Sequence, residues 1–169
     1  MTKQTIVVAG GALVAGIVLT AVVGFFSLPR LMMLEDASPH GFDETVTVFE
    51  DTVRSEGWSV LQVHDMQSIL SRHGHDVAAV KIFELCSSQY SAEILKLDDE
   101  RLVAPLMPCR VAIYEKSDGV TYIARMNSQL MARPFGGVIN SVMRKAAVET
   151  EQIIAQIING SPAVASASN

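Results

Sequence analysis

An uncharged apolar run near the N-terminus constrains this chain more than any other feature. The run extends from Thr5 to Leu28 and contains no Asp, Glu, Lys or Arg. About 20 apolar residues in a helix cross the hydrocarbon layer of a bilayer, so the run predicts one transmembrane helix. A cleaved signal peptide is the alternative, but its apolar region has about 7–15 residues and ends in a small-residue cleavage site. No such site precedes Pro29 and Arg30, so we expect residues 1–30 to be an uncleaved anchor.

The charges that flank the run favour one orientation. Lys3 and the terminal amine precede it, whereas Arg30, Glu35 and Asp36 follow it. Positive charges beside a span tend to stay in the cytoplasm, and the N-terminal tail is short. We expect a single-pass protein of the bacterial cytoplasmic (inner) membrane, with its globular domain in the periplasm.

Small residues recur at every fourth position within the run, at Ala12, Gly16, Thr20 and Gly24. On a helix this spacing forms one stripe, along which the backbone of a second helix can approach closely. The stripe suggests an interface with a membrane-protein partner or with a second copy of the chain. The alternative is that Gly and Ala are simply common in membrane helices.

The rest of the chain is long enough for one domain with its own core. We expect residues 31–159 to form this domain, and residues 160–169, which are mostly small and polar, to be a disordered tail. The net charge is −5, and Lys and Arg are scattered singly. The sequence therefore predicts no basic surface for a nucleic-acid backbone.

Hydrophobic periodicity in this domain alternates between that of helices and that of strands. Apolar residues at spacings of four, three and four predict a helix that begins at Phe42 and ends at Gly57. Asp65 is expected to cap a short helix that ends at Gly74, and Ser117-Asp118-Gly119 has the composition of a hairpin turn. Strands are predicted at 31–37, 58–64, 77–86, 106–115 and 120–126, and further helices at 92–97 and 138–158. The pattern therefore predicts an α+β domain.

Three stretches resemble one family. They are Gly57-Trp58, Phe83-Glu84-Leu85-Cys86 and Met107-Pro108-Cys109-Arg110-Val111-Ala112-Ile113-Tyr114-Glu115-Lys116-Ser117-Asp118-Gly119. Over about residues 38–127 the chain resembles the family called domain of unknown function 302, and Phe135-Gly136-Gly137 resembles a membrane-anchored branch of it. The resemblance implies helices packed on one antiparallel sheet, and it implies no established activity. Many relatives carry Cys-Asn-Pro where this chain has Cys86-Ser87-Ser88, so a role of that loop does not carry over.

Cys86 and Cys109 are the first candidates for chemistry. Twenty-two residues separate them, which allows their strands to lie side by side and their thiols to meet. A disulfide, a reversible redox pair, a metal thiolate site and a haem axial ligand are the functional alternatives. Packed thiols are the structural alternative, because free Cys is among the most buried residues. Neither belongs to Cys-x-x-Cys or Cys-x-x-Cys-His, which argues against thioredoxin-like chemistry and covalent haem attachment.

Other polar candidates accompany the cysteines. Glu84 and Arg110 are expected on the strands that carry the cysteines, and an ordinary ion pair is favoured over a catalytic pair. His73, His75 and His64 could offer nitrogen ligands to a metal, but a solvent-facing turn explains the first two equally well. Copper binding by methionines is a remoter alternative, because Met at core spacing usually fills gaps.

The sequence contains no recognisable catalytic machinery. Ser87 and Ser88 have no evident base and orienting acid, the acidic run at 98–100 lacks a phosphate-binding motif, and there is no nucleotide-binding glycine loop. We therefore predict a membrane-anchored module that binds a small ligand or metal, or an accessory subunit of an envelope or electron-transfer complex, rather than an enzyme. The alternatives are a thiol redox protein using Cys86 and Cys109, or a purely structural domain; the cofactor is unknown.

Overall fold

The computed structural model describes residues 3–160, which divide into two compact units at Met32. In the first unit, side chains are described from residue 11 onward, apart from those of residues 12 and 14. The predicted disordered tail, 160–169, lies outside the described residues except for Gly160.

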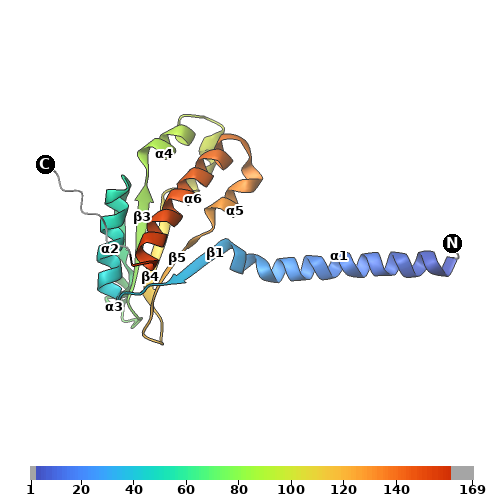
Figure 1. Ribbon diagram of the computed structural model, residues 1–169, viewed down its shortest axis with the longest axis horizontal. Helices are drawn as coiled ribbons and strands as arrows, with labels where there is room; N and C mark the ends of the chain where they lie inside the picture. The colour runs from blue at the N-terminus through green and yellow to red at the C-terminus, as the bar shows by residue number, and fades with distance from the viewer. Residues whose placement is uncertain (1–2, 161–169) are drawn as a thin grey trace. The chain divides into compact units, whose positions relative to one another are not determined.

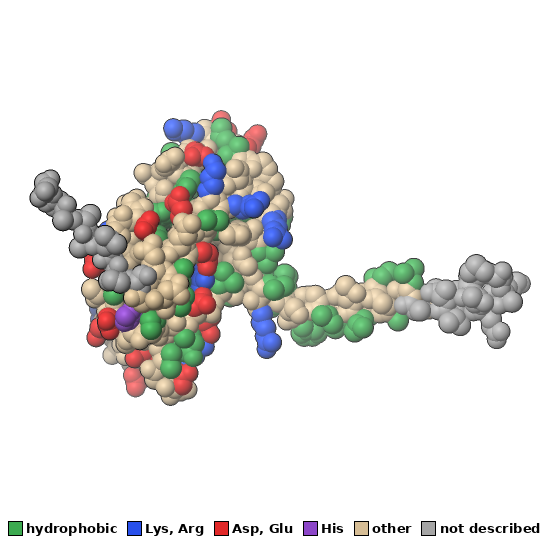
Figure 2. Space-filling view, in the orientation of Figure 1, with side chains coloured by type: hydrophobic (Ala, Val, Ile, Leu, Met, Phe, Trp, Pro, Cys, Tyr) green, Lys and Arg blue, Asp and Glu red, His purple; other side chains and the backbone are tan. Residues whose placement is uncertain are grey.

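The first unit is one long apolar helix, α1 (Lys3–Met32). Its segment Ala15–Met32 has a mean hydropathy of 1.7 and is entirely unburied, and by length and composition it is the one helix among residues 3–160 that could cross a membrane. Large apolar side chains are exposed along it (Figure 2). Phe25 and Phe26 are each 74% exposed. The helix continues through Pro29 to Met32, because Leu31 and Met32 favour helix, so the predicted strand at 31–37 begins two residues later.

The second unit contains a five-stranded antiparallel sheet in the order β1-β5-β4-β3-β2 (Figure 1). The strands are β1 (Met33–Ala37), β2 (Ser59–Asp65), β3 (Val80–Cys86), β4 (Cys109–Glu115) and β5 (Thr121–Met126). The predicted hairpin turn joins β4 to β5. Gly119 has a φ of 76° in this turn, a conformation that glycine adopts without strain.

Two long helices cover one face of the sheet (Figure 1). They are α2 (Phe42–Ser55) and α6 (Gly137–Ile158). The shorter helices are α3 (Met66–Ser71), α4 (Ser88–Leu95), α5 (Ser128–Ala132) and the 3-10 helices η1 (Glu100–Leu106) and η2 (Arg133–Phe135). Asp65 caps α3 as predicted, since its carboxylate accepts a hydrogen bond from the Ser68 amide at 2.8 Å. The predicted fold class, α+β with helices on one antiparallel sheet, is confirmed.

The main core lies between the sheet and the helices α2 and α6. Side chains that alternate along the central strands are fully or almost fully buried there, among them Phe83, Leu85, Val111, Ile113 and Ile123. Burial at every second residue is what the period of a strand requires when one face is covered. The face of β4 that carries Cys109, Val111 and Ile113 is therefore the core face.

A second, smaller core joins α4, η1 and α6. It consists of Ile94, Val103, Ile139 and Val142. The 3-10 helix η1 was not predicted, and it corrects the strand predicted at 106–115, which begins at Cys109 because Leu106 still belongs to η1. The strand predicted at 77–86 likewise begins at Val80, and the helix predicted at 92–97 covers Ser88–Leu95.

Candidate functional site

A cavity of about 70 Å³ lies where the two cores meet, at the end of β3 and the beginning of β4. Its walls come from β3, α4, η1, β4, β5, α5 and α6, so it depends on the folded domain. A cavity needs roughly 10–15 Å³ to admit one water molecule, so this space can hold a few atoms. We call it the sulfur-lined cavity, after the cysteines and methionines in its wall.

Six sulfur-bearing side chains line this cavity. They are Cys86, Cys109, Met107, Met126, Met131 and Met143. Both cysteines are free thiols, and four of the eight methionines of the chain are in this set. Thiols and thioethers are soft, polarisable groups, so the chemistry of this wall differs from that of an ordinary aliphatic core. The structure thus brings the two predicted cysteines to one site and adds methionines that the sequence did not single out.

The two cysteines arrive on neighbouring strands but are offset. In the antiparallel register Leu85 lies opposite Cys109, so Cys86 is one position beyond the direct pair. The Sγ of Cys86 lies 3.3 Å from the hydroxyl oxygen of Ser91 on α4. Burial raises the pKa of the Cys109 thiol, and the neighbouring Cys86 raises that pKa further. Cys109 is therefore protonated at neutral pH.

Arg125 forms part of the cavity wall, and its guanidinium is already bound to two carboxylates. Its side chain is 8% exposed, its Nε donates to Glu151 Oε1 at 2.9 Å, and its guanidinium also pairs with Asp36. Burial lowers the pKa of Arg125, but hydrogen bonds to Glu151 and Asp36 more than offset this and raise it. Because both carboxylates are already bound to it, this guanidinium serves the fold rather than an incoming anion.

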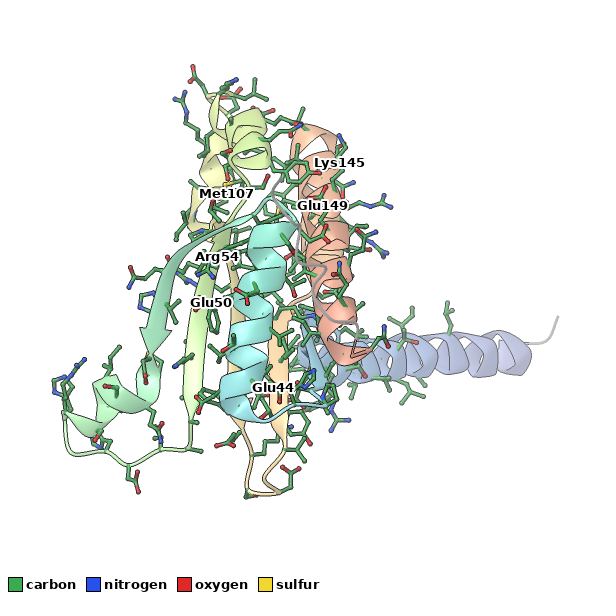
Figure 3. The ribbon with its side chains drawn as sticks, turned by 60° about the vertical axis from the view of Figure 1, so that its left-hand side comes forward. Glu44, Glu50, Arg54, Met107, Lys145 and Glu149 are labelled. Carbon is green, nitrogen blue, oxygen red and sulfur yellow. The ribbon has the colours of Figure 1, made fainter. Side chains whose placement is uncertain are left out.

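A second polar group contacts two residues of the cavity wall, Trp58 and Tyr90. Glu149 on α6 accepts hydrogen bonds from the Trp58 indole nitrogen at 3.0 Å and from the Tyr90 hydroxyl at 2.5 Å. The hydrogen bond to Glu149 raises the pKa of Tyr90. Figure 3 shows Glu149 and Met107 toward the same end of the domain. The sequence does indicate this polar group, because the carboxylate of Glu149 interrupts the apolar stripe of α6.

Glu84 and Arg110 form an ion pair across β3 and β4. They are partners in the register, and Arg110 donates to Glu84 Oε1 at 3.1 Å. His64 Nε2 lies 3.3 Å from the same oxygen. The Arg110 side chain is 60% exposed, so the pair resembles a solvated cross-strand contact more than a catalytic pair.

The predicted histidine ligands are not gathered into a site. His73 and His75 lie in the turn after α3, around Gly74, whereas His64 faces Glu84. Within residues 3–160 no group of three or more His, Cys, Asp or Glu could hold a metal ion.

The stripe of small residues in α1 is described in part. Ala12 lies outside the described side chains. The Thr20 hydroxyl donates to the Gly16 carbonyl at 2.9 Å, and a Cβ added at Gly16 or Gly24 would meet open space.

An antiparallel sheet with helices on one face and a cavity between two cores defines a small α+β domain with an internal site. The family model of the domain of unknown function DUF302 matches residues 34–160, and the chain belongs to this family. The crystal structure of an uncharacterized conserved DUF302 protein from Bacillus stearothermophilus is similar, with a TM-score of 0.68 and 19% identity. The match covers 75% of this chain and 98% of that one, and at this identity it establishes the fold alone. A search among curated proteins finds no match.

Proposed function

We propose that this chain is a membrane-anchored binding module whose ligand site is the sulfur-lined cavity. The observation that carries the proposal is the convergence of both cysteines and four methionines on one internal space. Internal sites for small ligands are mostly apolar, with a few specific groups that orient the ligand. Here the thiols and thioethers are those groups.

The raised pKa of Cys109 and the register offset between the two cysteines favour binding over thiol redox chemistry. A reactive thiol is usually a thiolate with a lowered pKa, held in a partly exposed, electropositive environment. The pKa of Cys109 is instead raised, first by burial and then by Cys86. The offset in register also places Cys86 beside, rather than opposite, Cys109, whereas a disulfide requires a narrow range of geometry. A cycling dithiol and a purely structural domain remain the alternatives.

We further propose that α1 crosses the cytoplasmic membrane and that the domain lies on its outer side. The exposed apolar side chains of α1 support a bilayer as its environment, and the charges that flank it support this orientation. The recurrence of small residues at Gly16, Thr20 and Gly24 supports packing against a helix of a partner or a second copy. The module would then be an accessory subunit of an envelope or electron-transfer complex.

Native mass spectrometry of the full chain in mild detergent tests the binding function. Spectra are recorded before and after incubation with the protein-free, small-molecule fraction of a bacterial extract. We expect an added mass on the wild-type chain and its loss in Ala147→Leu, which fills the cavity. Val148→Leu changes an exposed neighbour on α6 and should keep the added mass. A bare chain in both spectra, or an added mass that Ala147→Leu retains, would overturn the proposal.

A further inference from the structure

We infer that the sulfur-lined cavity binds one soft monovalent metal ion of the Cu(I) class, with Cys86 and Cys109 as its main ligands and a cavity methionine as a thioether ligand. This inference rests on the proposed binding function and names the ligand class. Met in a protein core usually fills gaps in the packing. Here half of the methionines of the chain lie around the two thiols, where a thioether can bind a metal ion.

The donor set selects the metal. Thiolate and thioether sulfur are soft ligands, and those that hold metals in proteins select Cu(I), Zn(II) or iron–sulfur clusters. Zinc sites of four protein ligands draw on Cys, His, Asp and Glu, and in the described part of the chain no three of these side chains gather around one point. Iron–sulfur clusters need about four Cys, and this chain has two. Cu(I) remains, since it accepts fewer ligands and binds thioethers.

Other side chains at the cavity do not compete for the ion. The carboxylate of Glu151 already accepts hydrogen bonds from Arg125, and it is the one carboxylate among the described residues of the lining. The other polar lining groups are neutral hydroxyls and the indole, or the cationic Arg110 and Arg125, and apart from the sulfur side chains the rest of the wall is aliphatic. A hard cation would find neither free carboxylates nor room for its water ligands here. The wall therefore favours an ion that prefers sulfur and releases water readily.

The offset of the two cysteines suits a bridging ion better than a direct bond. A disulfide requires the two sulfurs about 2.05 Å apart, whereas an ion with metal–sulfur bonds of about 2.3 Å can join sulfurs up to about twice that distance apart. Cys86 and Cys109 come from adjacent strands one position out of register, and both reach the same cavity. Ser91 lies within 3.3 Å of Cys86 Sγ and can donate a hydrogen bond to a metal-bound thiolate.

Two methionines are held in place on different walls. Met107 precedes β4 by two residues, and Met143 comes from α6; both pack against the second core. Figure 3 shows Met107 at this end of the domain. A thioether carries no proton and no charge, so it can bind Cu(I) without any change in ionisation. Each cysteine that binds the ion releases its thiol proton to solvent, and no electron is transferred.

Competition for Cu(I) tests the inference on the full chain in detergent micelles. The protein is reduced with a phosphine under argon and titrated against the coloured Cu(I) complex of bicinchoninate, whose bleaching measures transfer. Trp58 lines the cavity and is the one Trp of the chain, so its fluorescence reports binding of the ion within the cavity during the same titration. Native mass spectrometry gives the stoichiometry.

We expect one Cu(I) per wild-type chain with quenching of Trp58. Cys86→Ser and Cys109→Ser should each lower the affinity by at least about a hundredfold, because loss of a group that merely orients a metal ligand already costs roughly 10–100-fold. Met107→Leu with Met143→Leu should lower it by about tenfold. Met33→Leu, at an exposed site outside the cavity, is the matched control and should change nothing. If a Ser variant loses the native emission of Trp58, the Met variants decide, because Met→Leu conserves volume.

The possible failures are distinguishable from each other. Equal Cu(I) affinity in wild type and both Ser variants, or no affinity beyond that of Zn(II), overturns the metal inference. If the cavity still takes up another mass that Ala147→Leu excludes, the proposed binding function stands and only its ligand class was wrong. If neither metal nor any other mass binds, both proposals fail.

Discussion

Arg125 on β5 and Asp36 on β1 form an ion pair that ties the edge strand of the sheet to its neighbour. Glu151 on α6 binds the same guanidinium from the helix layer. One buried cation thus holds three elements together, and it does so beside the sulfur-lined cavity. The three partners are far apart in the sequence, so their contacts form only in the folded domain. A substitution of Arg125 therefore measures what these contacts contribute to stability.

Arg125→Met should destabilise the full chain by about 2–4 kcal/mol, because two carboxylates would then lie at a partly buried site without their cation. The urea midpoint in detergent micelles measures the loss. Arg54→Met is the matched control: its ion pair with Glu50, at 2.5 Å on the exposed side of α2 (Figure 3), should contribute less than about 1 kcal/mol. Equal losses in the two variants would contradict the role of Arg125.

Phe83→Leu should cost about 1–2 kcal/mol. Phe83 is fully buried, and its ring meets that of Phe49 edge-to-face with centroids 5.0 Å apart. The substitution removes this contact and leaves a small void in the main core. The same substitution at Phe135, which is 42% exposed, should change the free energy of unfolding by less than about 0.5 kcal/mol. A midpoint for Phe83→Leu equal to that of Phe135→Leu would show that the site repacks without cost.

The long periodic elements of this fold could be predicted because each shows its period several times. The stripe that begins at Phe42 covers three helical turns, and the alternation of Phe83, Glu84 and Leu85 marks a strand with one covered face. The helices α5 and η1 escaped prediction for the opposite reason. The first has five residues, and the second is a 3-10 helix that contains Pro105, so neither repeats a helical period.

The cavity could be predicted only in part. Cys86 and Cys109 are visible as rare residue types on neighbouring strands, whereas Met126, Met131 and Met143 belong to later elements that only tertiary packing brings to them. Arg125 did leave a signal. The period of β5 places it on the same face as the buried Ile123, and a guanidinium on a core face requires partners.

Glu149→Gln should weaken the contacts at the cavity border by about 1–3 kcal/mol. The Glu149 carboxylate accepts from both Trp58 and Tyr90, whereas an amide offers one acceptor and turns its NH₂ toward the other donor. Trp58 fluorescence should shift along with the urea midpoint, because its indole nitrogen loses a charged acceptor. Glu56→Gln changes a carboxylate at the exposed end of α2 and is the control. An unchanged Trp58 emission in Glu149→Gln would contradict the hydrogen bond.

Each of the three tyrosines of the chain has a raised pKa. The pKa of Tyr114 is raised to about 12, first by burial and then by its hydrogen bond to Glu35. Hydrogen bonds to Glu149 and to Asp118 raise the pKa of Tyr90 and of Tyr122. Phenolate absorbance of the folded chain should therefore appear at higher pH than that of the chain unfolded in urea.

The sign of the effect on stability follows from the same shift. The pKa of Tyr114 is higher in the folded chain than the ordinary 10.0, so its contribution is fully present below pH 10 and is lost as pH rises through about 12. Tyr114→Phe should remove the phenol that titrates last and should flatten the fall of the urea midpoint over that interval. Tyr122→Phe removes a phenol on the neighbouring strand and should leave that last step in place. If Tyr114→Phe instead removed absorbance at the ordinary pKa, Tyr114 would be solvated and its contact with Glu35 would not persist.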